Sequence, residues 1–337
     1  MTRRNLLSQQ DISVENNFDF LRFLLALSVF CTHYDRIFGE YFINFPITIS
    51  RSVSSFFVIS GMLIFRSCLR SSSLRSFWEK RFRRILPAYV LIVLLVVVLF
   101  FPFSSLGVRD YLFSSDMVKY LFANLTTLNF LHPGLPGVMD GAAVNPSLWT
   151  IKIELLLYLS TPLWVMLYER FDRSLSLFVV AIFSIVSVLL RWHADVTGVA
   201  VYDLVGKWGS LSACYLAGIS LYLYRDLLQR YKWHLFVPCL LLLLVADAPY
   251  VVEAVLPFAL GVVLFVVAFS FPFLNGFGRI GDLSYGIYVY HGPIIFFTIC
   301  LGWKLSLLGF AATLTITLLV AFLSWHLLEK RVLGRRK

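Results

Sequence analysis

Apolar stretches about as long as a membrane span alternate with short polar segments along the whole chain. A bilayer core of about 30 Å requires about 20 predominantly apolar residues in a helix, and ten stretches come close to that length. We therefore predict an all-α, polytopic integral membrane protein with about ten transmembrane helices. The predicted spans are residues 18–36, 47–65, 85–103, 148–168, 175–191, 205–224, 234–250, 252–270, 283–301 and 305–326.

A shorter apolar stretch lies between the third and fourth predicted spans. Residues 117–131 are interrupted by Asn124 and Asn129 and are followed by His132-Pro133-Gly134. Three placements stay open for this stretch: a span, a re-entrant segment or a segment at the membrane interface.

Composition supports the membrane class, and the distribution of charge predicts the orientation. Hydrophobic residues make up 59% of the 337 residues and charged residues 14%, whereas soluble domains have about 25% charged residues. With ten spans, 20 of the 29 Lys and Arg residues fall on the side of both termini and five on the other side. Because cytoplasmic loops are enriched in Lys and Arg, we predict that both termini are cytoplasmic. The net charge of +10 then requires no nucleic-acid partner.

Domain organisation and cysteine usage are simple. We predict one transmembrane domain over residues 1–337, with short cytoplasmic tails at 1–17 and 327–337. The five cysteines are scattered, mostly within apolar runs, and HExxH, Walker A and GxGxxG motifs are absent from the sequence. We therefore expect neither a disulfide framework nor a metal site.

Ionisable residues in the first predicted helix are the first candidates for function, because charges within a bilayer are costly. Arg22 and His33 are eleven residues apart, which is almost three turns and about 16 Å of rise, so they share one helix face. Asp19 precedes Arg22 by three residues and is placed to pair with it. The alternative is that Arg22 extends to the cytoplasmic interface and His33 caps the outer end of the helix.

The fourth long span adds a carboxylate at a similar depth. It opens with Asn145-Pro146-Ser147-Leu148-Trp149, in which Pro and Ser favour a helix start and Trp149 suits the membrane interface. Glu154 follows one or two turns inside the outer boundary. A carboxylate beside an imidazole fixes its tautomer and raises its basicity, so we predict that Glu154 orients His33. The alternative is a water-facing pair of Lys152 and Glu154, although residues two apart on a helix do not face each other.

A dense basic cluster follows the second span. Loop 66–84 holds seven Lys or Arg residues, a pattern that usually sets topology or binds anionic lipid. Guanidinium groups also suit phosphates, so an anionic cytoplasmic ligand is a competing interpretation. Arg81 and Arg84 share a helix face if the third helix begins before Pro87. The cluster ends with Lys80, Arg81, Arg83 and Arg84.

Two further motifs combine small, aromatic and histidine residues. Ser60-Gly61 in the second span allows a second helix to approach closely, and small-residue packing is the common explanation of such a pair. Ser284-Tyr285 begins an aromatic helix near the C-terminal end, and His291 lies deep in that ninth span. A structural role fits this histidine as well as a catalytic one.

In their order and spacing, these motifs resemble the membrane-bound acyltransferase family 3, whose members O-acylate sugars of bacterial envelopes. The resemblance covers residues 14–332. It departs from the family where Ile153-Glu154 replaces consecutive acidic residues and where Arg331 replaces a frequent proline. The matching motifs are Arg22-x10-His33, Phe56-Phe57-Val58-Ile59-Ser60-Gly61, Lys80 to Pro87, Ser147-Leu148-Trp149 with Glu154, Ser284-Tyr285 with Tyr288 and His291, and Ser324 with Glu329-Lys330.

The resemblance implies a multi-pass O-acyltransferase of the bacterial cytoplasmic (inner) membrane. It implies transfer of an acetyl group from acetyl-CoA, on the cytoplasmic side, to a hydroxyl of a glycan or glycolipid such as O-antigen, exopolysaccharide or lipooligosaccharide. His33 would be the general base or a transient acyl carrier, and Arg22 would bind the donor or stabilise charge on the thioester. The implied residues are His33, Arg22 and Glu154 as catalytic, Lys80, Arg81, Arg83 and Arg84 for CoA phosphates, and Asp19, Ser60, Trp149, Tyr285 and His291 in support; no metal is implied.

Two other classes compete with the enzyme. A secondary transporter would use Asp19, Arg22, His33 and Glu154 as a proton relay, but the sequence shows no inverted repeat of the kind transporters often contain. A scaffold that binds only membrane lipid is disfavoured by the polar residues along the helices.

Overall fold

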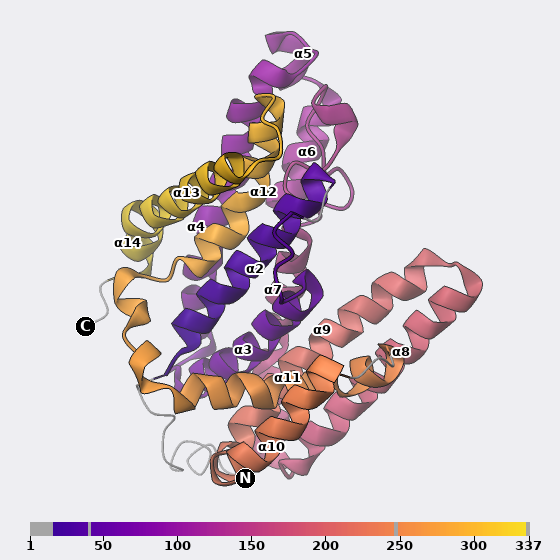
Figure 1. The fold of residues 1–337 in the computed structure, drawn as a ribbon, viewed down its shortest axis with the longest axis vertical. Helices are drawn as coiled ribbons and strands as arrows, with labels where there is room; N and C mark the ends of the chain where they lie inside the picture. Colours follow the sequence, from indigo (N-terminus) through magenta and orange to yellow (C-terminus); the bar gives the residue numbers. More distant parts are fainter. Residues whose placement is uncertain (1–15, 40–41, 246–248, 335–337) are drawn as a thin grey trace. The chain divides into compact units, whose positions relative to one another are not determined.

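The computed structural model describes residues 16–39, 42–245 and 249–334, which fold as helices joined by turns and loops (Figure 1). Each predicted span overlaps one long helix, so the all-α prediction is confirmed. The long helices are α2 (Phe18–Phe38), α3 (Ile49–Arg70), α4 (Leu74–Phe100), α7 (Trp149–Arg170), α8 (Ser174–Thr197), α9 (Ala200–Leu223), α10 (Arg225–Val245), α11 (Pro249–Ser270), α12 (Ser284–Cys300) and α13 (Leu307–Ser324). The shorter elements are η1 (Phe101–Phe103), α5 (Val108–Leu112), α6 (Ser115–Leu125), η2 (Met139–Gly141), η3 (Pro272–Leu274), η4 (Phe277–Ile280), the π-helix η5 (Trp325–Glu329) and α14 (Lys330–Leu333).

The chain is a polytopic membrane protein. Within the described residues, six helical segments are long and apolar enough to cross a bilayer, and a bent pair of 272–280 with α12 makes a seventh if it is one span. Helices α2, α9 and α10 are equally long but more polar. The total of ten crossings and the cytoplasmic side of both termini stay predictions, and residues 1–15 of the predicted N-terminal tail lie outside the described residues. The six segments are Ile49–Arg70, Leu74–Phe103, Trp149–Arg170, Ser174–Thr197, Tyr250–Ser270 and Leu307–Leu333.

The short apolar stretch between the third and fourth spans forms α6. This helix has 11 residues, or about 16 Å, so it does not cross a core of about 30 Å. The predicted C-terminal tail at 327–337 is helical as far as it is described, because η5 and α14 continue α13.

The described residues form two compact units that are interleaved along the sequence. Among the described residues, unit 1 takes its members from 16–25, 50–77 and 156–279, and unit 2 from 26–49, 78–155 and 280–334. Helices α2, α4 and α7 contribute residues to both. The prediction of one domain over the whole chain stays a prediction.

Unit 1 contains α3 and the four helices α8 to α11. Helices α8 and α9 form a hairpin that turns at Gly198, whose φ of 70° is left-handed. Arg191 of α8 pairs with Asp203 of α9 and with Glu253 of α11, so these charges are satisfied inside the helix group.

A close helix crossing in unit 1 explains the Ser60-Gly61 pair. A Cβ atom on Gly61 of α3 would overlap the backbone of Tyr215 on α9, so only glycine permits this separation. The interpretation of the pair as small-residue packing is therefore confirmed at Gly61, while Ser60 is half-buried.

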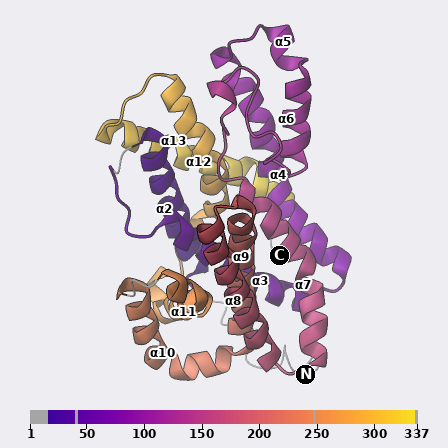
Figure 2. The ribbon, with the colours of Figure 1, turned by 90° about the vertical axis from the view of Figure 1, so that its right-hand side faces the viewer.

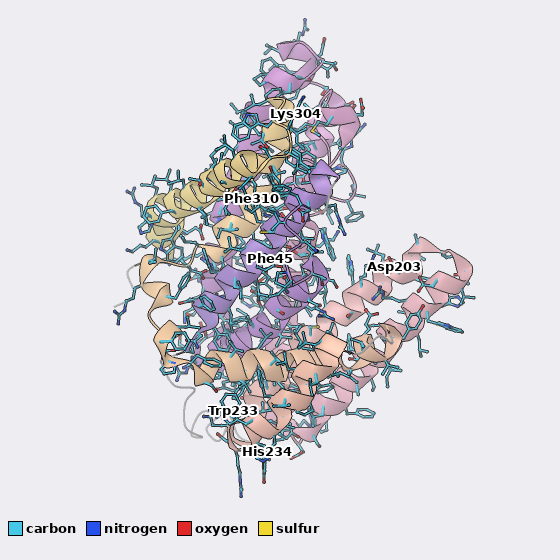
Figure 3. The ribbon with its side chains drawn as sticks, viewed as in Figure 1. Phe45, Asp203, Trp233, His234, Lys304 and Phe310 are labelled. Carbon is cyan, nitrogen blue, oxygen red and sulfur yellow. The ribbon has the colours of Figure 1, made fainter. Side chains whose placement is uncertain are left out.

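Unit 2 contains the second half of α2, most of α4, and α12 with α13. Helix α13 packs on both α12 and α2, and the ring of Phe310 (Figure 3) lies 5.2 Å from that of Tyr34. Helices α5 and α6 lie beside the end of α4 in Figures 1 and 2, where the Tyr111 hydroxyl donates to the Val97 carbonyl at 2.9 Å. Because α4 begins at Leu74, the predicted shared helix face of Arg81 and Arg84 is confirmed.

Candidate active site

A proline in α12 creates the attachment point for the start of α7. Pro293 has no N–H, so the carbonyl of Val289, four residues earlier, lacks its usual partner within the helix. The Asn145 side-chain nitrogen donates to that carbonyl at 2.9 Å. At the adjacent Gly292, an added Cβ would lie about 3.0 Å from Pro146. The Asn145-Pro146 segment therefore lies directly against α12.

Hydroxyl groups continue this attachment at Tyr288, the residue before Val289 on α12. The Ser147 hydroxyl is 2.6 Å from the Asn145 side-chain oxygen and 3.0 Å from the Tyr288 carbonyl. The Thr150 and Tyr288 hydroxyls lie 2.7 Å apart. The start of α7 is thus tied to α12 within unit 2.

His33 and His291 form a buried pair within unit 2. Nδ1 of His33 lies 2.7 Å from Nε2 of His291, and the ring centroids are 4.9 Å apart with the planes inclined by only 19°. His33 is 6% exposed and His291 is fully buried. The two helices α2 and α12 therefore bring together residues 258 positions apart in the sequence.

The hydrogen-bond chain assigns the protons of this pair when both rings are neutral. Nδ1 of His291 is 3.0 Å from the Ile287 carbonyl oxygen, which only accepts, so this nitrogen donates. Nε2 of His291 must then accept from Nδ1–H of His33. Consequently Nε2 of His33 is unprotonated and its lone pair can take a proton. A base whose tautomer is set by a hydrogen-bonded partner is the arrangement that general-base catalysis requires.

Glu154 belongs to the part of α7 that lies in unit 2. The side chain is half-buried. The observed hydrogen-bond partner of His33 is His291. Orientation of His33 by Glu154 therefore stays a prediction.

Trp149 and Lys152, which lie near Glu154 in the sequence of α7, have different environments. Trp149 is the first residue of α7 and is half-buried. The Lys152 ammonium lies 4.2 Å from the centre of the Phe130 ring, an arrangement typical of a cation–π contact.

The other predicted residues of the first helix lie in unit 1. Arg22 pairs with Asp19 on α2, which confirms the pair predicted from the three-residue spacing. The start of α2 is fixed by Asn17, whose side-chain nitrogen donates to the Val267 and Phe271 carbonyls at 2.9 Å each. Arg22 is therefore held near a firmly attached helix end.

The basic cluster of α4 separates into exposed and enclosed side chains. Lys80 and Arg83 are exposed and Arg81 is half-buried. Arg84, by contrast, forms ion pairs with Asp282 at 2.6 Å and with Glu329 at 3.0 Å. Tyr285 donates to the Ile85 carbonyl at 2.8 Å, beside the same ion pairs.

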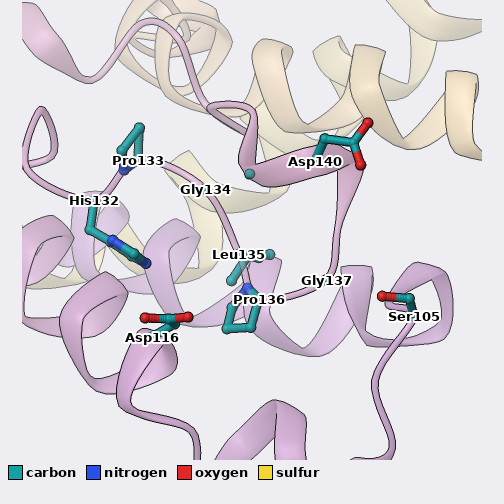
Figure 4. Close-up of a pocket in the computed structure, with 10 residues that line it drawn as sticks. Ser105, Asp116, His132, Pro133, Gly134, Leu135, Pro136, Gly137 and Asp140 are labelled. Atoms are coloured by element: carbon teal, nitrogen blue, oxygen red, sulfur yellow. The ribbon is translucent and has the colours of Figure 1, made fainter.

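A polar cavity of about 280 Å³ lies in the loops between α4 and α7 (Figure 4). His132 and Asp116 lie next to each other on one side of it. Asp116 accepts a hydrogen bond from Lys119 at 3.0 Å, which lowers the pKa of its carboxyl group. Over the described residues, no group of three or more His, Cys, Asp or Glu side chains could hold a metal ion.

Sequence patterns alone do not identify Asp35 as a structural residue of this region. Its carboxylate, 5% exposed, accepts hydrogen bonds from the backbone nitrogens of Ile43 and Asn44 at 3.0 to 3.2 Å. The Ser28 hydroxyl donates to the Ile47 carbonyl at 2.7 Å. The segment after α2 therefore folds back along that helix, and a carboxylate eight residues before a loop amide gives no sequence signal for such a contact.

The fold defines a multi-pass membrane protein with a buried histidine pair among its helices, and comparison with known proteins gives the chemistry. Residues 15–326 match the model of the acyltransferase 3 family, described as an acyltransferase domain. The chain belongs to this family, and the protein is an acyltransferase.

Two relatives cover most of the chain and a third covers part of it. Nodulation protein 10 of Rhizobium leguminosarum bv. viciae is 28% identical over 95% of this chain and 94% of the relative. The O-acetyl transferase of Shigella phage Sf6 is 26% identical over 95% of this chain and 96% of the relative. The peptidoglycan O-acetyltransferase OatA of Listeria monocytogenes is 32% identical over 36% of this chain and 20% of its own length. No solved structure matches the chain.

Proposed function

We propose that the protein is an O-acetyltransferase of the bacterial cytoplasmic membrane, with ten spans and both termini cytoplasmic. The donor is acetyl-CoA on the cytoplasmic side, and the acceptor is a hydroxyl of a glycan or glycolipid. Family membership supports acyl transfer, and the relatives named as O-acetyl transferases support the acetyl group and a glycan acceptor. The observation that carries the proposal is the buried hydrogen-bonded pair of His33 and His291, in which Nδ1 of His33 faces His291 and Nε2 is left for the acceptor hydroxyl.

In the proposed reaction His33 acts as the base. Nε2 takes the proton of the acceptor hydroxyl while the hydroxyl oxygen attacks the thioester carbonyl. The C–S bond then breaks, and the CoA thiolate receives the proton from His33. His291 contributes by holding Nδ1–H of His33, so the basic nitrogen is always Nε2. A two-step reaction, in which Nε2 first accepts the acetyl group, uses the same lone pair.

The remaining predicted residues have separate roles in this proposal. Arg22 binds the donor through charge-assisted hydrogen bonds. Eleven residues of helix place it about 16 Å along α2 from His33, which is too far for both to touch one carbonyl. Glu154 orients His33. Lys80, Arg81 and Arg83 bind the CoA phosphates through charge-assisted hydrogen bonds.

The test compares surface glycans of cells with and without the gene by mass spectrometry. We expect an additional mass of one acetyl group with the wild type, and its loss by about a hundredfold or more with His33→Ala. His234→Ala is the matched control, because this histidine is exposed on α10. It should leave acetylation unchanged.

Two results would count against the proposal. Full acetylation by both His33→Ala and Arg22→Ala would refute the catalytic assignment. An unchanged glycan combined with altered solute uptake would favour the transporter alternative instead.

A further inference from the structure

Arg84 is enclosed by groups of its own unit. One terminal nitrogen donates to Asp282 at 2.6 Å and the other to Glu329 at 3.0 Å. The rings of Tyr285 and Trp325 each have their centre 5.4 Å from the guanidinium carbon. The Arg84 side chain is 19% exposed and that of Glu329 only 1%. Both terminal nitrogens of the fork are thus engaged by carboxylates.

These carboxylates belong to two segments that frame the site. Asp282 precedes α12 and accepts from the Ser284 hydroxyl at 2.6 Å. Glu329 ends the π-helix after α13 and accepts from the Ser324 hydroxyl at 3.0 Å. The Ser324 hydroxyl also lies 2.9 Å from that of Tyr290 on α12. Arg84 therefore joins α4, the start of α12 and the end of α13.

The π-helix explains how Glu329 reaches this position. In an α-helix, residues five apart differ by about 140° around the axis. The wider π turn, with i to i+5 hydrogen bonds, brings such residues to one side, and π turns are frequent at functional sites. Ser324 and Glu329 are five residues apart and share a hydrogen bond. The π turn therefore places the Glu329 carboxylate within ion-pair distance of Arg84.

The position of α12 matters because it carries His291. Nine residues of chain, about 13 Å along a helix, separate Asp282 from that histidine. A helix moves largely as a unit, so displacement at its start shifts Nε2 of His291 relative to His33. A misplacement of about 1 Å costs on the order of a hundredfold in rate.

We infer that Arg84 is a positioning residue that sets the start of α12, and through it His291, and that it is not a ligand of the donor phosphates. The inference rests on the proposed function, because the reaction that Arg84 would affect is the proposed acetyl transfer. Phosphate contacts then fall to Lys80, Arg81 and Arg83, of which Lys80 and Arg83 are exposed.

Kinetics with two donors separate the two roles. Acetyl-CoA carries phosphates, whereas acetylpantetheine has the same thioester and none. We expect Arg84→Gln to lower kcat by about 10- to 100-fold with both donors and to leave the KM for acetyl-CoA within about twofold. Arg84→Lys keeps the positive charge but loses the two-pronged guanidinium group, so its kcat should lie between those of the wild type and Arg84→Gln. Arg83→Gln should raise the KM for acetyl-CoA alone. A selective rise in the KM for acetyl-CoA with Arg84→Gln would overturn the inference.

Thermal stability of the purified protein in detergent gives a readout independent of catalysis. Arg84→Gln and Glu329→Gln should each lower Tm, and the double variant should lower it no further, because neither partner is then left as an unpaired buried charge. The combination of Arg83→Gln with Glu329→Gln should be additive. Additive effects for Arg84 and Glu329 would overturn the inference. If the wild type does not transfer from acetyl-CoA at all, the proposed donor is wrong. The Tm values of the single and double variants of Arg84 and Glu329 still test the role of Arg84 in that case.

Discussion

The proton assignment of the histidine pair predicts a difference between two substitutions of similar size. An asparagine at position 291 has polar atoms near the place of Nδ1 but none near Nε2, whereas a glutamine extends an amide oxygen to the place of Nε2. In His291→Asn the buried Nδ1–H of His33 therefore loses its acceptor. In His291→Gln the acceptor is retained.

The magnitude follows from the burial of the pair. Leaving a buried donor unsatisfied costs about 1–3 kcal/mol, and each 1.36 kcal/mol is tenfold in rate. His33 is 6% exposed and its partner fully buried, so water does not readily replace the lost acceptor. We expect His291→Asn to lower kcat by about 5- to 150-fold, because His33 is no longer fixed in the tautomer with a basic Nε2. We expect His291→Gln to stay within about tenfold of the wild type.

Steady-state transfer from acetyl-CoA by the purified protein measures both variants, with expression and Tm confirming that each is folded. Labelling of histidine with ¹⁵N adds a direct readout, because protonated and unprotonated ring nitrogens have different chemical shifts. The neutral wild type should show Nε2 of His33 unprotonated. Equal activity of the two variants, or a proton found on Nε2 of His33, would refute the assignment.

Two further predictions concern the packing that supports the site. Asn145→Asp removes the donor to the Val289 carbonyl and should destabilise the protein by about 1–3 kcal/mol, measured as a lower Tm, whereas Asn145→Gln retains an amide donor and should lose less. Gly61→Ala places a methyl group against the Tyr215 backbone and should lower Tm and expression, while Gly107→Ala, which meets open space, should leave both unchanged; equal effects at the two glycines would contradict the close crossing.

Sequence periodicity and length were sufficient to predict the helices, because apolar runs of span length have few other solutions in a membrane. Local pairs were also predictable. Arg22 with Asp19 follows from a spacing of three residues, and the crossing at Gly61 follows from its small size. These features depend on neighbours along one helix or on a single residue type.

The contacts of the site were not predictable in this way. His33 and His291 are 258 residues apart, and Arg84 is 198 and 245 residues from its two carboxylates. A single sequence contains no information on which helices lie side by side. A weak signal was nevertheless present, since a proline two residues after His291 leaves a carbonyl for another segment to satisfy.

The proline in α12 also has a consequence for how members of such a family can diverge. The loop of residues 132–144 reaches α12 through the short attachment at Asn145 and Ser147, so we expect changes upstream of that attachment to leave the register of α7 on α12 unaltered. Loops of different length and composition should therefore be interchangeable ahead of this attachment. A chimaera that exchanges residues 132–144 for those of a relative, and keeps Asn145, Ser147 and Pro293, should retain the catalytic geometry while presenting a new outer surface.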